Sequence, residues 1–74
     1  MEFQKDDLTE AKRQIDSTLH KLRETVKTLE AKENAGRYKP QITLAKRRIR
    51  AFEIANCLIE KELTDQDTRS GLPG

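Results

Sequence analysis

Apolar side chains recur at intervals of three and four residues through two separate stretches of this chain. That spacing places them on one face of an α-helix. In the first stretch they are Leu8, Ala11, Ile15, Leu19, Leu22, Val26 and Leu29. In the second stretch they form a coiled-coil-like seam that includes one polar member, and the series is Ile42, Ala45, Ile49, Phe52, Asn56, Ile59 and Leu63. Charged residues make up 38% of the chain and aromatics 4%, a composition that also favours an all-α fold over a β one.

The first helix is expected over about residues 7–35. Asp6 and Asp7 can cap its start, and Glu10 follows Asp7 by three residues, as in a capping box. At the other end, Asn34 and Gly36 can adopt the left-handed conformation that closes a helix. The apolar stripe of this helix is about one side chain wide, so it can cover one neighbour only.

The connection over residues 36–39 is short, and short connections join antiparallel helices. Pro40 fits the first turn of a second helix, which is expected to end near residue 63. Tyr38 is expected to pack on the loop end of the hairpin, with ligand stacking as the alternative. Residues 1–63 are therefore predicted to form one helical hairpin. Residues 64–74 lose the apolar period and are predicted to be a disordered tail.

The second helix carries another row of residues beside its seam, at about 100° per residue. This row consists of Leu44, Arg48, Ala51, Ala55, Leu58 and Glu62. Together the two rows cover close to half of the helix surface, which the narrow first helix cannot shelter. A hairpin of this size is also marginally stable alone. We therefore expect two hairpins to pair as a closed homodimer in the form of a four-helix bundle.

A particular pairing follows from two charges in the second row. If two copies of this helix cross antiparallel at Ala55, Arg48 of one chain lies opposite Glu62 of the other. The alternative is that both side chains extend to water from the rim of the intramolecular interface. Asn56 either fixes the register or the oligomeric state, or bonds to a nearby backbone carbonyl or water. The expected dimer interface is Leu44, Arg48, Ala51, Phe52, Ala55, Leu58, Ile59 and Glu62.

Charge is distributed unevenly along the hairpin. Residues 37–50 hold six cations and no acid, whereas residues 53–67 hold five acids and only Lys61 as a cation. Antiparallel pairing would set these unlike ends side by side. The basic end could also contact nucleic-acid phosphates, although the net charge of +2 is small and no helix-turn-helix or stacking aromatics are evident. The candidate phosphate contacts are Arg37, Lys39, Lys46, Arg47 and Arg50.

Little in the sequence indicates chemistry. One cysteine, Cys57, and one histidine, His20, cannot supply the four Cys/His ligands of a structural zinc site, and no cofactor motif is present. Neither residue has an identifiable catalytic partner, so we expect no enzyme. The single thiol indicates a reducing compartment, and no signal peptide or apolar stretch long enough to span a membrane is apparent. A soluble, cytoplasmic protein is expected.

These observations predict a small non-enzymatic interaction or regulatory protein. It would act inside the cell by helix-mediated homodimerisation and by binding a protein partner of unknown identity. The alternative is an accessory nucleic-acid-binding protein that uses the basic end of the second helix.

Overall fold

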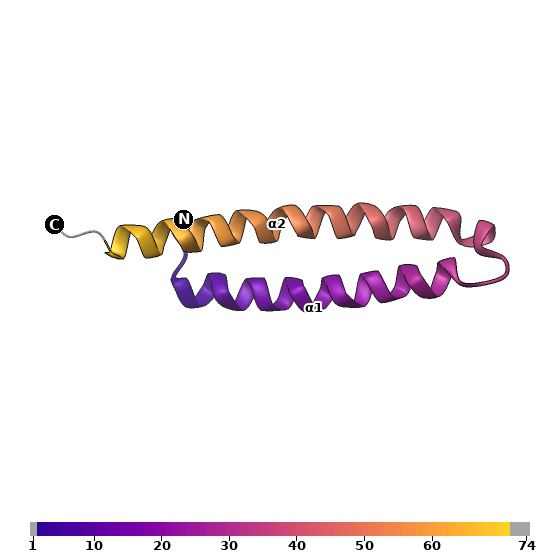
Figure 1. Cartoon of the computed structure of the whole chain (residues 1–74), viewed down its shortest axis with the longest axis horizontal. Coiled ribbons are helices and arrows are strands. Elements are labelled where there is room, and N and C mark those ends of the chain that lie inside the picture. The colour runs from indigo at the N-terminus through magenta and orange to yellow at the C-terminus, as the bar shows by residue number, and fades with distance from the viewer. Residues whose placement is uncertain (1, 72–74) are drawn as a thin grey trace.

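The computed structural model describes residues 2–71, and the side chains of residues 2–66, as a long antiparallel helical hairpin (Figure 1). Helix α1 spans Lys5–Glu30, a short 3₁₀ helix η1 spans Ala35–Tyr38, and helix α2 spans Lys39–Gly71. The rod measures 62 × 20 × 15 Å, so it is two helices wide and one helix thick. No strand occurs within residues 2–71, and the predicted all-α hairpin is confirmed.

The α1–α2 seam holds the core. Every residue of the two predicted apolar series is buried or half-buried against the other helix. Burial is nevertheless shallow, since the most sheltered apolar residue, Leu19, is still 4% exposed. A single interface between two helices leaves each side chain close to water on at least one side. The buried residues are Leu8, Leu19, Val26, Ala45 and Asn56.

The start of α1 lies earlier than the sequence predicts. Gln4 is the N-cap residue, and its backbone N–H donates to Oδ2 of Asp7 at 3.3 Å. The capping box therefore joins Gln4 and Asp7, and the predicted box between Asp7 and Glu10 is wrong. Asp6 and Asp7 lie instead in the first turn, where carboxylates are favoured by the helix dipole. Glu10 accepts hydrogen bonds from Arg13 and Gln14 further along the helix.

The turn between the helices also differs from the prediction. Helix α1 ends at Glu30 rather than near residue 35, and η1 occupies most of the connection. Asn34 has φ −104°, and Gly36 lies within η1 without a positive φ, so neither takes the predicted left-handed conformation. Tyr38 is half-buried at this end, where Lys32 Nζ lies 5.5 Å from the centre of its ring.

Helix α2 continues well past residue 63. Residues 64–71, which the sequence predicts to be part of a disordered tail, are helical here, and residues 72–74 of that prediction lie outside the described residues. No proline or glycine occurs over residues 41–70, so the backbone can extend the helix. Gln66 Nε2 donates to the carbonyl oxygen of Phe3 at 3.1 Å, which ties this extension to the segment before α1.

Leu19→Ala should lower the free energy of unfolding by about 2 kcal/mol, because it opens a gap in the most sheltered part of the seam. That is a large fraction of the stability of so small a protein. Thermal unfolding followed by circular dichroism measures the change. Lys21→Ala, on the exposed surface of α1, is the control and should change the midpoint little. Equal losses in both variants would contradict the position of the seam.

Candidate protein-interaction surface

The outer side of α2 exposes large apolar residues. Leu44 and Ile54 are each 47% exposed, and Leu58 is 61% exposed. Ala51, between them in sequence, is exposed too. These four residues, here called the outer apolar row, are spaced by seven, three and four positions and so lie along one face of the helix. The only other large apolar residue of comparable exposure within residues 2–66 is Phe3, which precedes α1.

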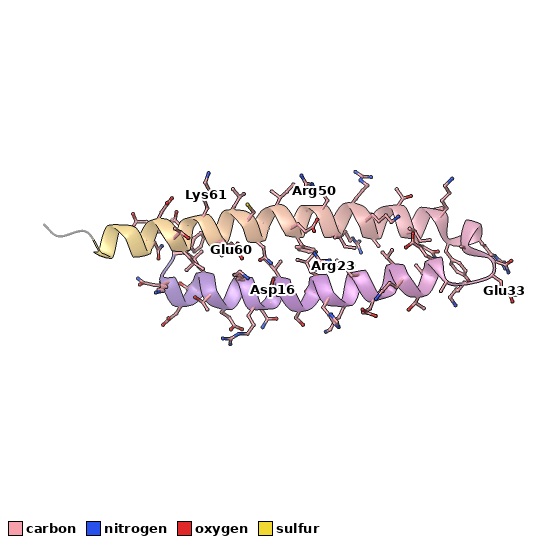
Figure 2. The ribbon with its side chains drawn as sticks, viewed as in Figure 1. Asp16, Arg23, Glu33, Arg50, Glu60 and Lys61 are labelled. Carbon is pink, nitrogen blue, oxygen red and sulfur yellow. The ribbon has the colours of Figure 1, made fainter. Side chains whose placement is uncertain are left out.

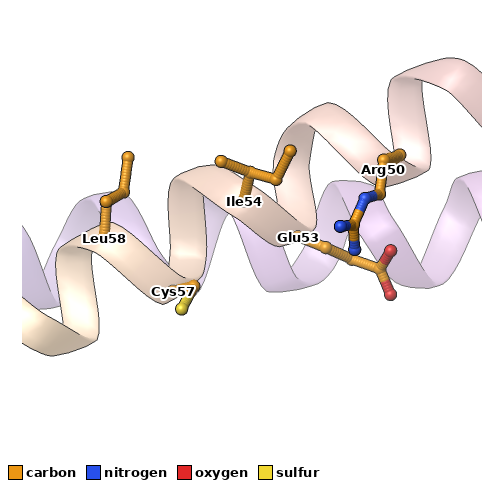
Figure 3. Close-up of a pocket in the computed structure, with 5 residues that line it drawn as sticks. All are labelled: Arg50, Glu53, Ile54, Cys57 and Leu58. Atoms are coloured by element: carbon orange, nitrogen blue, oxygen red, sulfur yellow. The ribbon is translucent and has the colours of Figure 1, made fainter.

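A shallow depression of about 190 Å³ lies on this side of α2 (Figure 3). Its lining side chains are Arg50, Glu53, Ile54, Cys57 and Leu58, all from the same helix. Pockets that enclose small molecules are usually larger, at about 300–1,000 Å³, and are walled by several elements. An open hollow along one helix is instead the shape into which a side chain of another helix can pack.

The predicted dimer interface divides into two groups. Leu44, Arg48, Ala51 and Leu58 are exposed on the outer side of α2. The remaining members are half-buried, and two of them, Phe52 and Ile59, belong to the seam with α1. The half-buried residues are Phe52, Ala55, Ile59 and Glu62. The structure therefore places only the first group on a free surface of the hairpin.

Two further details modify the expected interface. Glu62 already accepts a hydrogen bond from Gln66 Nε2 at 3.4 Å within its own helix. Ile54 belongs to the exposed surface, although the predicted interface does not include it. Its position three residues after Ala51 and four before Leu58 is the signal that could have identified it.

The basic residues of the predicted phosphate-binding end are all exposed: Arg37, Lys39, Lys46, Arg47 and Arg50. They are not all unneutralised, since Lys46 Nζ lies 3.2 Å from the Glu30 carboxylate of α1. Within residues 2–66, no carboxylate forms an ion pair with Arg47, Arg48 or Arg50. In Figure 2, Arg50 and Lys61 lie on the side of α2 that faces away from α1.

A polar crossing interrupts the apolar seam near its middle. Asn56, 8% exposed, donates from Nδ2 to Oδ1 of Asp16 on the opposite helix. Lys12 Nζ lies 3.0 Å from Asp16 Oδ2 and 3.2 Å from Glu60 Oε1, and so connects both helices as well. The Asn56 amide therefore bonds to a carboxylate across the hairpin, not to a nearby backbone carbonyl. Because these four polar groups meet in only one alignment of α1 and α2, they help to fix the register of the hairpin.

The same crossing carries an unsatisfied group. Asn56 Oδ1 is buried and accepts no hydrogen bond from a described residue. A buried acceptor without a donor costs about 1–3 kcal/mol. Asn56 therefore contributes to alignment of the helices at a cost in stability.

Charge shifts the pKa values of two members of this crossing. The hydrogen bond from Lys12 lowers the pKa of Asp16 below 3.8, against a smaller opposing effect of desolvation. The hydrogen bonds to Asp16, first, and to Glu60 raise the pKa of Lys12 above 10.5. The ionised Asp16 carboxylate thus stabilises the fold when the pH is above the pKa of Asp16 in the unfolded chain. This contribution is lost as the pH falls through the pKa of Asp16 in the folded chain, which lies below 3.8. Both side chains are accessible to water, so the contribution is small.

A second ion pair between the helices joins Arg23 Nη2 to Glu53 Oε2 at 3.1 Å. Together with the Lys12–Glu60 and Lys46–Glu30 pairs, it distributes cross-links along the length of the hairpin. In the predicted charge pattern, Glu53 and Glu60 belong to the acidic end. Each of these acids is partly neutralised by a cation of α1, so the polarity of the rod is weaker than its α2 sequence suggests.

The two residues considered for catalysis lie on different helices. His20 is exposed on α1, and Cys57 is an exposed free thiol at the edge of the depression. Asp16, one turn before His20, bonds to Lys12 and Asn56 instead. Over the described residues, no group of three or more His, Cys, Asp and Glu side chains could hold a metal ion. Neither α1 nor α2, as far as they are described, has an apolar stretch long enough to cross a membrane.

Lys12→Met should raise the pKa of Asp16 toward that of an ordinary aspartate, because it removes the cation that stabilises the carboxylate while keeping the length of the side chain. A pH titration of the side-chain carboxyl carbon by NMR gives this value directly. Lys21→Met is the matched control, since Lys21 lies on the exposed surface of α1 and has no part in the crossing. An Asp16 titration that is identical in the wild type and the Lys12→Met variant would contradict the described contact.

No protein-family model matches the chain. No curated protein and no solved structure shows significant similarity to it.

Proposed function

We propose that this protein is a small, non-enzymatic interaction module that acts through helix–helix contacts made by the outer side of α2. Its first partner is a second copy of the same chain, and the resulting dimer presents its remaining surface to another protein. The observation that supports this role is the outer apolar row, which lies exposed on a helix whose opposite side already packs on α1. Exposed apolar surface of this kind typically marks a protein contact.

The energetics of a two-helix rod favour such an association. Ordering a residue costs about 1.5 kcal/mol, while burial of apolar surface returns about 25 cal/mol per Å². One interface between two helices nearly balances these terms, and no apolar side chain of residues 2–66 is completely buried. Covering the outer apolar row would add burial while ordering few further groups, because α2 is already helical. Association therefore stabilises the hairpin as well as creating an interface.

Charge supports an antiparallel arrangement of the two copies. Arg47, Arg48 and Arg50 lie in the first half of α2, and Glu60 and Asp65 lie in the second half. In a parallel dimer the arginines would approach their own counterparts, whereas antiparallel copies place them toward the acidic half. This attraction is modest, because Glu60 already pairs with Lys12 and salt screens exposed charges.

Leu58→Asp should shift the chain toward monomer by at least tenfold in dissociation constant, because it places a carboxylate at the most exposed apolar position of the row. Sedimentation equilibrium over a range of concentrations measures the shift. Ser17→Asp adds the same charge on the exposed surface of α1 and should leave the dissociation constant unchanged. Circular dichroism checks that both variants keep the helical content of the wild type. A wild-type chain that remains monomeric at every concentration would contradict the proposed dimer.

A second candidate function is nonspecific binding of nucleic acid. It is supported by Arg47, Arg48 and Arg50, which are exposed and make no ion pair within residues 2–66. Guanidinium groups of this kind bind phosphates, and their contribution falls as salt rises. The exposed Arg37 and Lys39 add positive charge near the same end of the rod.

A gel shift with random-sequence duplex DNA at low salt tests this candidate. The wild type should retard the duplex at low salt and lose the retardation as salt rises, while a variant carrying Arg47→Gln and Arg50→Gln should bind at least tenfold more weakly. Arg13→Gln is the matched control, because Arg13 lies on α1 and pairs with Glu10. The absence of any shift at low salt would remove nucleic-acid binding from consideration.

A further inference from the structure

Three of the four residues of the outer apolar row are evenly spaced, with Ala51 midway between Leu44 and Leu58. Leu44 lies seven residues before Ala51, and Leu58 lies seven residues after it. Seven residues of an α-helix turn through about 700°, which is 20° short of two full turns. The three side chains therefore lie in a nearly straight line along α2, with a small residue between two large ones. All three are exposed.

We propose that a second copy of the chain packs antiparallel on this line, with the two-fold axis of the dimer beside Ala51. Leu44 then packs on the partner's Leu58, and Leu58 packs on the partner's Leu44. The two Ala51 side chains meet at the axis, where their small size allows the helices to approach closely. This inference rests on the self-association proposed above and specifies its register and direction.

Exposure favours a crossing at Ala51 over the crossing at Ala55 expected from the sequence. A crossing at Ala55 draws on Phe52 and Ile59, which are already half-buried toward α1, and on Glu62, which accepts a hydrogen bond from Gln66. Those groups have less surface left to bury. A crossing at Ala51 uses the apolar side chains that α1 leaves uncovered.

The arginines beside the row favour the antiparallel direction. Arg47 and Arg48 lie four and three residues before Ala51, and the axis sets them beside the partner's Ala55 and the partner's Ile54. Their aliphatic stems can cover this apolar surface while the guanidinium groups stay in water. Parallel copies in the same register would instead place each arginine beside its own counterpart, at a cost in like-charge repulsion.

The proposed contact also determines the shape of the dimer. Ala51, at the centre of the row, and Asn56, in the middle of the seam, are five residues apart, which corresponds to a turn of about 500°, or 140° around α2. In a square four-helix bundle the two neighbours of a helix lie about 90° apart. The dimer is therefore flatter than such a bundle, with the two α2 helices in the middle and an α1 helix on each outer side.

Disulfide cross-linking of single-cysteine variants tests this register. In a Cys57→Ser background, Ala51→Cys should link to its own copy and give a band at twice the chain mass of 8.6 kDa. The Leu44→Cys and Leu58→Cys variants should each stay unlinked alone, because antiparallel copies hold the two equivalent residues about 21 Å apart along the helix. An equimolar mixture of these two variants should form the mixed disulfide. All three positions are exposed, so the substitutions leave the seam intact.

Other outcomes would overturn the proposal in distinct ways. Self-linking by Leu44→Cys and by Leu58→Cys would show a parallel dimer. Self-linking by Ala55→Cys but not by Ala51→Cys would place the crossing four residues later. A dimer in sedimentation that links at none of these positions would use another surface. A Cys57→Ser chain that is monomeric would refute the proposed self-association itself, together with its register.

Discussion

The structure depends on one constraint: two helices side by side form a single interface, and that interface must supply the whole core. Helix α1 meets this constraint with a narrow apolar stripe, of which Leu8, Leu19 and Val26 become buried. Helix α2 supplies an opposing seam but carries further apolar residues on its outer side. The thin core and the exposed row therefore have the same origin, because α1 can cover only one side of α2.

Polar contacts between the two helices fix their register. Apolar contacts alone would tolerate a shift of one helix along the other by a whole heptad, since similar residues recur at that interval. The Asp16–Asn56 hydrogen bond and the Lys12 bridge to Glu60 would be lost in such a shift. Asn56 thus places a polar group in the apolar seam, and its bond to Asp16 favours one alignment of the helices.

The sequence predicts the hairpin and its seam because helical periodicity is a local property that apolar spacing records directly. Helix ends are less predictable, since they depend on individual hydrogen bonds. The Gln4–Asp7 capping contact and the Gln66 bond to Phe3 carry no periodic signal. At the candidate surface, spacing alone grouped Ala55 and Glu62 with Leu44 and Leu58, although the first two are half-buried and the other two are exposed. The sequence also could not show that Lys46, Glu53 and Glu60 are paired with residues of α1.

The elongated shape of the hairpin has a consequence for its motions. The hairpin is a rod of 62 × 20 × 15 Å. Each helical turn therefore contacts only the neighbouring turns of its own helix and the facing turn of the other helix. Separation of the helices can then spread from the open end toward the loop without first disrupting the whole molecule. The polar crossing divides the seam into two apolar halves; it is formed by Lys12, Asp16, Asn56 and Glu60. The half that ends in the loop would be the last to open, because its helices are joined by the chain itself.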